Sequence, residues 1–362
     1  MKILLTILTI LLSLPCWANM ASPIQEGTWA ATPFISKYVD ILREKIHITP
    51  DRDFRTAKFT IEYHINAGRS GEQIPLLFYA SEFKESFKVW VDGVEINLST
   101  VPEAYTELEG TPFSDFGYFF ETKGWSDTKQ VHIENFPSGG FYVSIDDLKF
   151  FETDLAEGNH LIKVEYVAEQ WVDRSWWVKE YSFRYALSPA KYWKSFGELE
   201  ITLDASGTNR NFVANIGQPT KGDLASTAVW TFSALPTEVL IISHIPEMNA
   251  KASMLLAISP TGLAAIFAVI LMLFHFLAMW LFRKTNSEKR FSWVMIIGCL
   301  AIPFAALVAY IFSFGIIDDA IGPDAGNYHG YTFMVIVYYP ILLAVYWLFM
   351  WLVDRQMAKR FR

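Results

Sequence analysis

The sequence predicts an exported antiparallel β-sandwich followed by three transmembrane helices. One observation is the separation of charge from apolar residues. Of 362 residues 52% are hydrophobic, yet residues 19–253 hold 21 Lys and Arg against 33 Asp and Glu, a net charge of −12. Residues 254–362 hold only 8 basic and 5 acidic residues. The other observation is the alternation of apolar and polar residues in the first block, which is typical of half-buried strands.

The first residues have the pattern of a secretory signal peptide. Lys2 supplies a positive charge, an apolar run extends to Pro15, and Cys16 and Ala18 precede an expected cleavage site at the −3 and −1 positions. We therefore expect residues 1–18 to be removed. The alternative is an uncleaved anchor helix, but the apolar run of about 13 residues is short of the roughly 20 that a span requires. A lipoprotein signal would need a small residue where Pro15 stands.

The two cysteines favour a bacterial envelope. Cys16 would leave with the signal peptide and Cys299 lies in an apolar stretch, so the exported block has no disulfide. A block of this size buries enough surface to fold without one. Thiol catalysis, cysteine-based zinc sites and CxxC redox chemistry are excluded for the exported block.

Three stretches have the length of membrane spans, namely residues 260–282, 291–317 and 331–353. None contains Asp, Glu, Lys or Arg. At 1.5 Å per residue, a helix of 23 residues measures about 34 Å, which exceeds a hydrocarbon core of about 30 Å. The alternative, buried helices of a soluble protein, would need three such uncharged runs in succession. We therefore expect three transmembrane helices.

Charges in the connecting loops predict the orientation of the spans. The loop 283–290 and the tail 354–362 are basic, whereas the loop 318–330 holds three Asp and no Lys or Arg. The positive-inside rule places the two basic segments in the cytoplasm and the acidic loop outside. A signal peptide independently places residues 19–253 outside. The sequence thus predicts a multi-pass protein of the bacterial inner membrane, with a periplasmic or extracellular N-terminal domain and a cytoplasmic C-terminus.

Strands are expected throughout the exported block. Residues 58–65 alternate between apolar and polar side chains, and Asp92-Gly93 separates two alternating runs, which predicts a tight hairpin. Short strands are expected at five further places, 181–187, 198–203, 211–216, 228–232 and 238–243.

The exported block is expected to divide near Trp171. The two parts would be residues 19–170 and 171–250, with one continuous β-rich domain as the alternative. A short helix is expected near residues 35–43. Residues 251–259 would form a tether to the first span.

The strand from Leu155 to Tyr166 has an L-x-x-G-x-H-x-I-x-V-x-Y-like pattern. It resembles the closing strand of many exported bacterial immunoglobulin-like sandwiches. The resemblance covers a dozen residues and implies a fold class only, so it assigns no functional residues.

Several functions are excluded or disfavoured by what the sequence contains. A net charge of −12 disfavours nucleic acid as a partner, because phosphate binding needs a basic surface. The chain has no G-x-S-x-G, G-x-x-x-x-G-K-[ST], H-E-x-x-H or EF-hand pattern, and no cofactor is expected. His275 lies inside the first span, but the spans hold no second His for a haem and no acid for a proton relay. We therefore interpret His275 as a packing residue.

An aromatic cluster with interspersed cations is the main candidate site. It could form a stacking surface for a glycan or a protein partner, although a sandwich core with its rim is the favoured explanation of such a cluster. The candidate residues are Trp171, Arg174, Trp176, Trp177, Tyr192 and Trp193.

A second candidate is the loop 318–330. Its possible cation ligands match no ligand spacing, so no metal is expected there. They are Asp318, Asp319, Asp324, Asn327 and His329.

The first functional hypothesis is a non-enzymatic envelope protein, held in the lipid bilayer, whose ectodomain binds another envelope protein or a glycan. One alternative is an accessory subunit of a membrane transporter or of an envelope-biogenesis enzyme complex. A second alternative is a hydrolase acting on surface polymer, since carboxylate pairs are not visible in sequence.

Overall fold

The computed structural model describes residues 25–26, 33–34, 39–68, 73–79, 87–100, 119–123, 129–133, 141–144, 148–187, 195–208, 210–237, 239–327 and 329–361. The expected signal peptide, residues 1–18, lies outside this part of the chain. Two compact units are present. The β unit comprises Gln25–Asp173 and Glu180–Ile245, and the helical unit contains Arg174–Lys179 and Pro246–Arg362.

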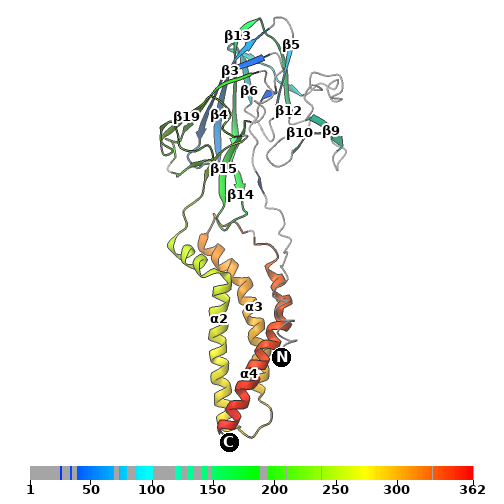
Figure 1. Cartoon of the computed structure of the whole chain (residues 1–362), viewed down its shortest axis with the longest axis vertical. Coiled ribbons are helices and arrows are strands. Elements are labelled where there is room, and N and C mark those ends of the chain that lie inside the picture. Colours follow the sequence, from blue (N-terminus) through cyan, green and yellow to red (C-terminus); the bar gives the residue numbers. More distant parts are fainter. Residues whose placement is uncertain are drawn as a thin grey trace. The chain divides into compact units, whose positions relative to one another are not determined.

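An eight-stranded sheet dominates the β unit (Figure 1). The predicted strands at 58–65, 198–203 and 228–232 are confirmed within it. In spatial order its strands are β18 (Lys221–Gly222), β19 (Thr227–Phe232), β16 (Ser195–Asp204), β3 (Val39–Pro50), β4 (Thr56–Ala67), β13 (Gly158–Glu169), β6 (Lys88–Val91) and β7 (Val94–Ile96).

The predicted hairpin at Asp92-Gly93 is confirmed. Strands β6 and β7 pair antiparallel with Val91 opposite Val94, which leaves a two-residue loop. Asp92 and Gly93 have φ values of 49° and 83°. Positive φ at both central residues is the requirement of the hairpin turn whose twist matches the flanking strands.

A five-stranded sheet lies across the same core. Its order is β1 (Gln25–Glu26), β14 (Trp171–Asp173), β15 (Glu180–Ala186), β20 (Val239–His244) and β17 (Val213–Ala214). Two smaller sheets complete the described strands. One contains β2 (Pro33–Phe34), β5 (Gln73–Tyr79), β12 (Leu148–Asp154) and β8 (Ser99–Thr100), and the other β11 (Phe141–Ser144), β10 (Lys129–Ile133) and β9 (Phe119–Lys123).

One hydrophobic core joins the two large sheets. Phe59 of the eight-stranded sheet lies 6.4 Å, ring to ring, from Phe183 of the five-stranded sheet. Strand β4 buries every second residue, so its alternate side chains face this core. The opposite face carries ion pairs, such as that of Arg43 with Glu200. This one-sided burial explains why the period-two pattern located the strands.

Two expectations for the β unit are corrected. The helix expected near residues 35–43 is wrong, because residues 39–43 belong to strand β3. The register of β3 against β4 shifts between Ile41 and Arg43, and this bulge breaks the alternation that identifies a strand. The antiparallel expectation also fails for one pair, since β16 and β3 run parallel. These strands are distant in sequence and need no hairpin between them.

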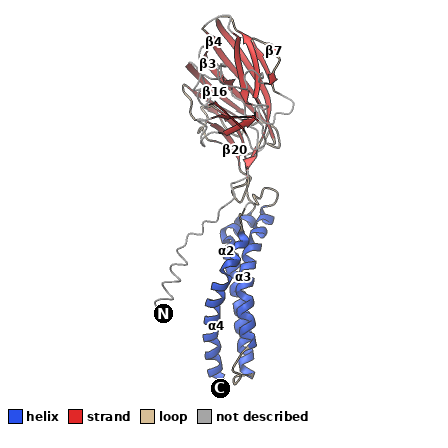
Figure 2. Ribbon diagram, turned by 90° about the vertical axis from the view of Figure 1, so that its right-hand side faces the viewer, coloured by secondary structure: helices blue, strands red, loops and turns tan. Residues whose placement is uncertain are grey.

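The helical unit contains the three expected spans (Figure 2). They are helices α2 (Ala250–Thr285) and α3 (Trp293–Ile321), and a third span of the 3₁₀ helix η4 (Thr332–Tyr338) followed by α4 (Tyr339–Phe361). Each is long and apolar enough to cross a membrane. Large apolar side chains cover their outer surfaces, which suits a lipid environment.

Residues 251–259, expected as a tether, are helical up to a kink. Ser259 has φ 67° and is followed by Pro260, so the first nine residues of α2 form a separate helical segment. Asn249 caps this segment by accepting the backbone N–H of Ala252 at 2.8 Å. The third span changes helix type before Pro340, which occupies the first turn of α4, where the missing N–H costs no hydrogen bond.

Candidate functional site

The structure distributes the candidate aromatic residues over different environments. Trp171 lies in β14 with 7% of its surface exposed, and the Arg184 guanidinium stacks 4.6 Å from its ring centroid. Arg174, Trp176 and Trp177 lie in the segment that joins β14 to β15 and belongs to the helical unit. Tyr192 and Trp193 lie outside the described residues.

Residues 174–179 are bound along the loop that follows α3. The backbone N–H of Lys179 donates to Asp324 at 2.8 Å, and that of Gly326 donates to Trp177 at 2.8 Å. Val178 forms an antiparallel bridge with Ala325 between these two bonds. The Lys179 Nζ donates to the Pro323 carbonyl at 2.7 Å. We call this contact, residues 174–179 with 314–329, the hairpin–loop clasp.

Glycine is required at one position of the clasp. A Cβ atom added to Gly326 would lie 2.0 Å from the carbonyl oxygen of Trp176. Because backbone atoms meet there, no rotamer change relieves the contact.

An aromatic box holds the Trp177 side chain in the clasp. Its ring lies 5.5 Å from that of Phe314, nearly parallel to it, and 4.4 Å from that of His329. His329 is oriented in turn by Asp318, since its Nε2 lies 2.8 Å from both carboxylate oxygens. Trp176, the neighbouring residue, has 71% of its surface exposed. Adjacent residues thus differ in environment, since Trp177 is held inside the clasp and Trp176 is exposed.

The loop 318–330 uses its polar groups mainly within the clasp. Asp318 pairs with His329, and Asp324 contributes its backbone carbonyl. Among the described residues, no three His, Cys, Asp or Glu side chains converge as cation ligands.

A polar contact joins all three helices of the helical unit. His275 on α2 has its Nε2 3.1 Å from the Val294 carbonyl of α3, so this nitrogen carries a proton and donates. Its Nδ1 then accepts from the Tyr346 hydroxyl of α4 at 2.8 Å. Gly298 allows the contact, because a Cβ atom there would lie 2.2 Å from the His275 Nε2. Both ring nitrogens are used in packing.

A buried ion pair lies where α2 ends. Arg283 donates from Nε to Asp354 of α4 at 2.7 Å and makes a second bond from Nη2 to the other carboxylate oxygen. Its Nη1 donates to the Lys289 carbonyl at 2.6 Å. The two side chains are 3% and 9% exposed. Arg283 belongs to the basic loop that predicted orientation, yet its charge is paired inside the protein.

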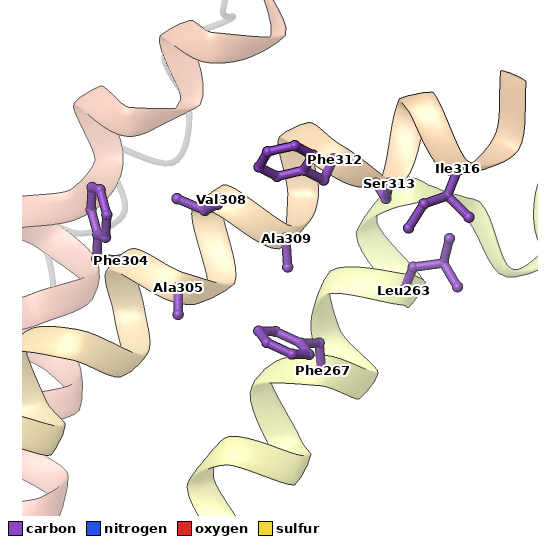
Figure 3. Close-up of a pocket in the computed structure, with 9 residues that line it drawn as sticks. All are labelled: Leu263, Phe267, Phe304, Ala305, Val308, Ala309, Phe312, Ser313 and Ile316. Atoms are coloured by element: carbon purple, nitrogen blue, oxygen red, sulfur yellow. The ribbon is translucent and has the colours of Figure 1, made fainter. Parts of the chain in front are cut away.

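An apolar groove of about 570 Å³ lies between α2 and α3. Figure 3 shows Leu263 of α2 and Ile316 of α3 pointing toward one another across it, with Ala305 and Ala309 farther along α3. Ser313 is the polar residue of the lining, and its hydroxyl donates to the Tyr310 carbonyl at 2.6 Å. The groove therefore offers contact area to an apolar ligand or helix and little to a polar one.

Sequence reasoning missed several of these residues. Phe314, Tyr346 and Asp354 find their partners only through tertiary contacts. A signal for Asp354 was available, because it stands next to an apolar span that a buried charge can enter only when paired.

Comparison with known proteins yields only weak likeness. No protein-family model and no curated protein matches the chain. Among solved structures, yeast LTA4 hydrolase is similar with a TM-score of 0.31 and 9% identity, over 57% of this chain and 29% of that one. An M1 zinc metallopeptidase from Deinococcus radiodurans gives 0.26 and 10%, over 58% and 43%. The chain spans less than half the length of these proteins. At these TM-scores the likeness carries no conclusion about fold or activity.

Proposed function

We propose that the chain is a non-enzymatic, multi-pass protein of the bacterial inner membrane whose exported ectodomain binds another envelope protein or a glycan. The ectodomain is an immunoglobulin-like β-sandwich in this proposal, and it comprises the β unit. The charges of the loops 283–290 and 318–330 support an exported β unit and a cytoplasmic C-terminus. One core shared by two sheets supports the sandwich.

The hairpin–loop clasp is the observation that carries this proposal. The clasp lies within the helical unit and holds residues 174–179, which link β14 to β15, with two backbone hydrogen bonds and the boxed Trp177 ring. This segment is thereby fixed, and Trp176 on it stays exposed. A rigid aromatic side chain on a fixed backbone is a favourable contact for a partner.

Site-specific cross-linking in intact cells tests the proposal. A photoreactive amino acid replaces Trp176 in the full chain, and the adducts are identified by mass spectrometry. We expect one protein or glycan to dominate, and we expect its yield to fall when Arg174 is also replaced by Ala. A matched control carries the photoreactive residue at Val213 on β17, which is 65% exposed. Equal adducts at both positions, or lipid adducts alone, would contradict the proposal.

A second candidate function is an accessory subunit of a membrane transporter or an envelope-biogenesis enzyme. The groove between α2 and α3 favours it, because a partner helix could pack against the apolar lining. The same cross-linking series distinguishes the two candidates when a photoreactive residue replaces Phe312, which lines the groove. Adducts with a multi-span protein at this position, and none at Trp176, would favour the accessory subunit.

A further inference from the structure

A carboxyl group is buried in the core of the β unit. Glu44 lies on β3 and is 1% exposed. It shares the core-facing side of the strand with Ile46 and Ile48, which are also 1% exposed. The bulge after Ile41 produces this placement, because it shifts the alternation by one residue and turns Glu44 inward. Carboxyl groups are rarely fully buried unless they are paired.

Among the described residues, the neighbouring strands present tyrosines and no cation to this carboxyl group. Tyr185 of β15 donates its hydroxyl to the Glu44 Oε1 at 2.9 Å. The Tyr63 hydroxyl of β4 lies 2.6 Å from that of Tyr185. Tyr166 of β13 is the third tyrosine of the cluster, and burial together with the nearby charge of Glu44 raises its pKa. Arg43 is next to Glu44 in the chain but extends to the opposite face of the sheet, where it binds Glu200.

We propose that Glu44 is a proton-binding site in the core of the ectodomain. Its carboxyl group is protonated in acid and ionised above neutral pH, and proton binding stabilises the folded β unit. The chemistry of the cluster carries this inference. A neutral carboxylic acid fits among tyrosine hydroxyls and apolar side chains, whereas a carboxylate there has hydrogen bonds but no opposite charge from the part of the chain that the structure describes. The proposal stands apart from the partner-binding function and does not depend on it.

The titration of Glu44 gives the direction of the effect. Burial raises the pKa of Glu44 from 4.5 to about 7, although the hydrogen bonds from Tyr185 and Tyr63 act in the opposite direction. Between these two values the folded state holds a proton that the unfolded state releases. Stability is therefore greatest in acid and is lost as the pH rises from 4.5 to about 7. The equilibrium constant for unfolding of the β unit should rise by about a few hundredfold across this interval, because each unit of pKa difference is a factor of ten.

Infrared spectroscopy and hydrogen exchange of the full chain in lipid nanodiscs test the proposal. The carbonyl stretch of a protonated carboxyl group should be present at pH 6, where ordinary Asp and Glu side chains are ionised, should be lost by pH 9, and should be much weaker at pH 6 in Glu44→Gln. After correction for intrinsic exchange rates, the amides of β3 and β4 should be less protected from hydrogen exchange at pH 9 than at pH 5. In Glu44→Gln the same amides should have almost equal protection at pH 5 and at pH 9.

Tyr185→Phe provides a matched variant with a directional result. It removes a hydroxyl that stabilises the carboxylate, so the infrared midpoint should move to higher pH. Three results would overturn the proposal: a carboxylate that stays ionised down to pH 5, a protonated band that persists at pH 9, or identical pH profiles for the wild type and Glu44→Gln. The infrared measurement on the wild type decides the question even if both variants fail to fold.

Discussion

Replacing Asp354 by Ala is expected to destabilise the helical unit by about 3–5 kcal/mol, the usual cost of removing one partner from a buried ion pair. Arg283 would keep its bond to the Lys289 carbonyl but would lose both bonds to the carboxylate. Its charge would then be buried without a counter-ion, since its side chain is 3% exposed. We expect α4 to separate from the end of α2.

Thermal unfolding in detergent micelles measures this effect, and Arg355→Ala is the matched control. Arg355 is the next residue, is exposed and is also charged, so its loss should change the midpoint little. The exchange Arg283→Asp with Asp354→Arg should recover part of the lost stability, because the pair is retained in reverse. Equal effects of the Asp354 and Arg355 variants would show that the pair does not hold the helices together.

Replacing Gly298 by Ala is expected to destabilise the helical unit by about 1–3 kcal/mol, which is typical of overpacking. The new Cβ atom would lie 2.2 Å from the His275 Nε2, and it would displace the imidazole from the Val294 carbonyl and the Tyr346 hydroxyl. Without these two hydrogen bonds, the three helices should separate around His275. Unfolding midpoints of the purified variants give the measurement.

A control and a double variant sharpen the Gly298 prediction. Gly315 lies on the same helix, and an added Cβ atom there meets nothing within 4 Å, so Gly315→Ala should be neutral or slightly stabilising. In the double variant of Gly298→Ala with His275→Ala, the clash is absent. The two effects should therefore be far from additive. Simple additivity would exclude a direct contact between the two residues.

The sequence was sufficient where a local pattern decides the structure. The three spans were predicted from uncharged runs. The turn was predicted from the pair Asp92-Gly93, because Asp and Gly tolerate the positive φ that both positions adopt. Residues 251–259 were predicted as a tether, and the helix that Ala250 to Ile258 form there was not predicted. A capping Asn249 was the available signal.

Tertiary contacts explain what could not be predicted. The bulge in β3 depends on pairing with β4, so the local sequence did not reveal that residues 39–43 form a strand. The same bulge turns Glu44 inward, although its parity with Ile46 and Ile48 was visible in the sequence. The clasp joins residues 174–179 to a loop about 150 positions later, and no local signal relates such distant segments.

A pair of cysteines at Val178 and Ala325 tests whether the clasp forms in cells and whether it lies outside the cytoplasm. In this antiparallel bridge the flanking hydrogen bonds run from Lys179 to Asp324 and from Gly326 to Trp177. Such a pair has a Cα separation of about 4.5 Å, which a disulfide accommodates. We expect Val178→Cys with Ala325→Cys to form this disulfide in growing cells, because the clasp brings the two residues together and is proposed to lie in an oxidising compartment. Failure of the Val178 and Ala325 pair to cross-link in cells, with both cysteines still present as free thiols, would contradict this expectation.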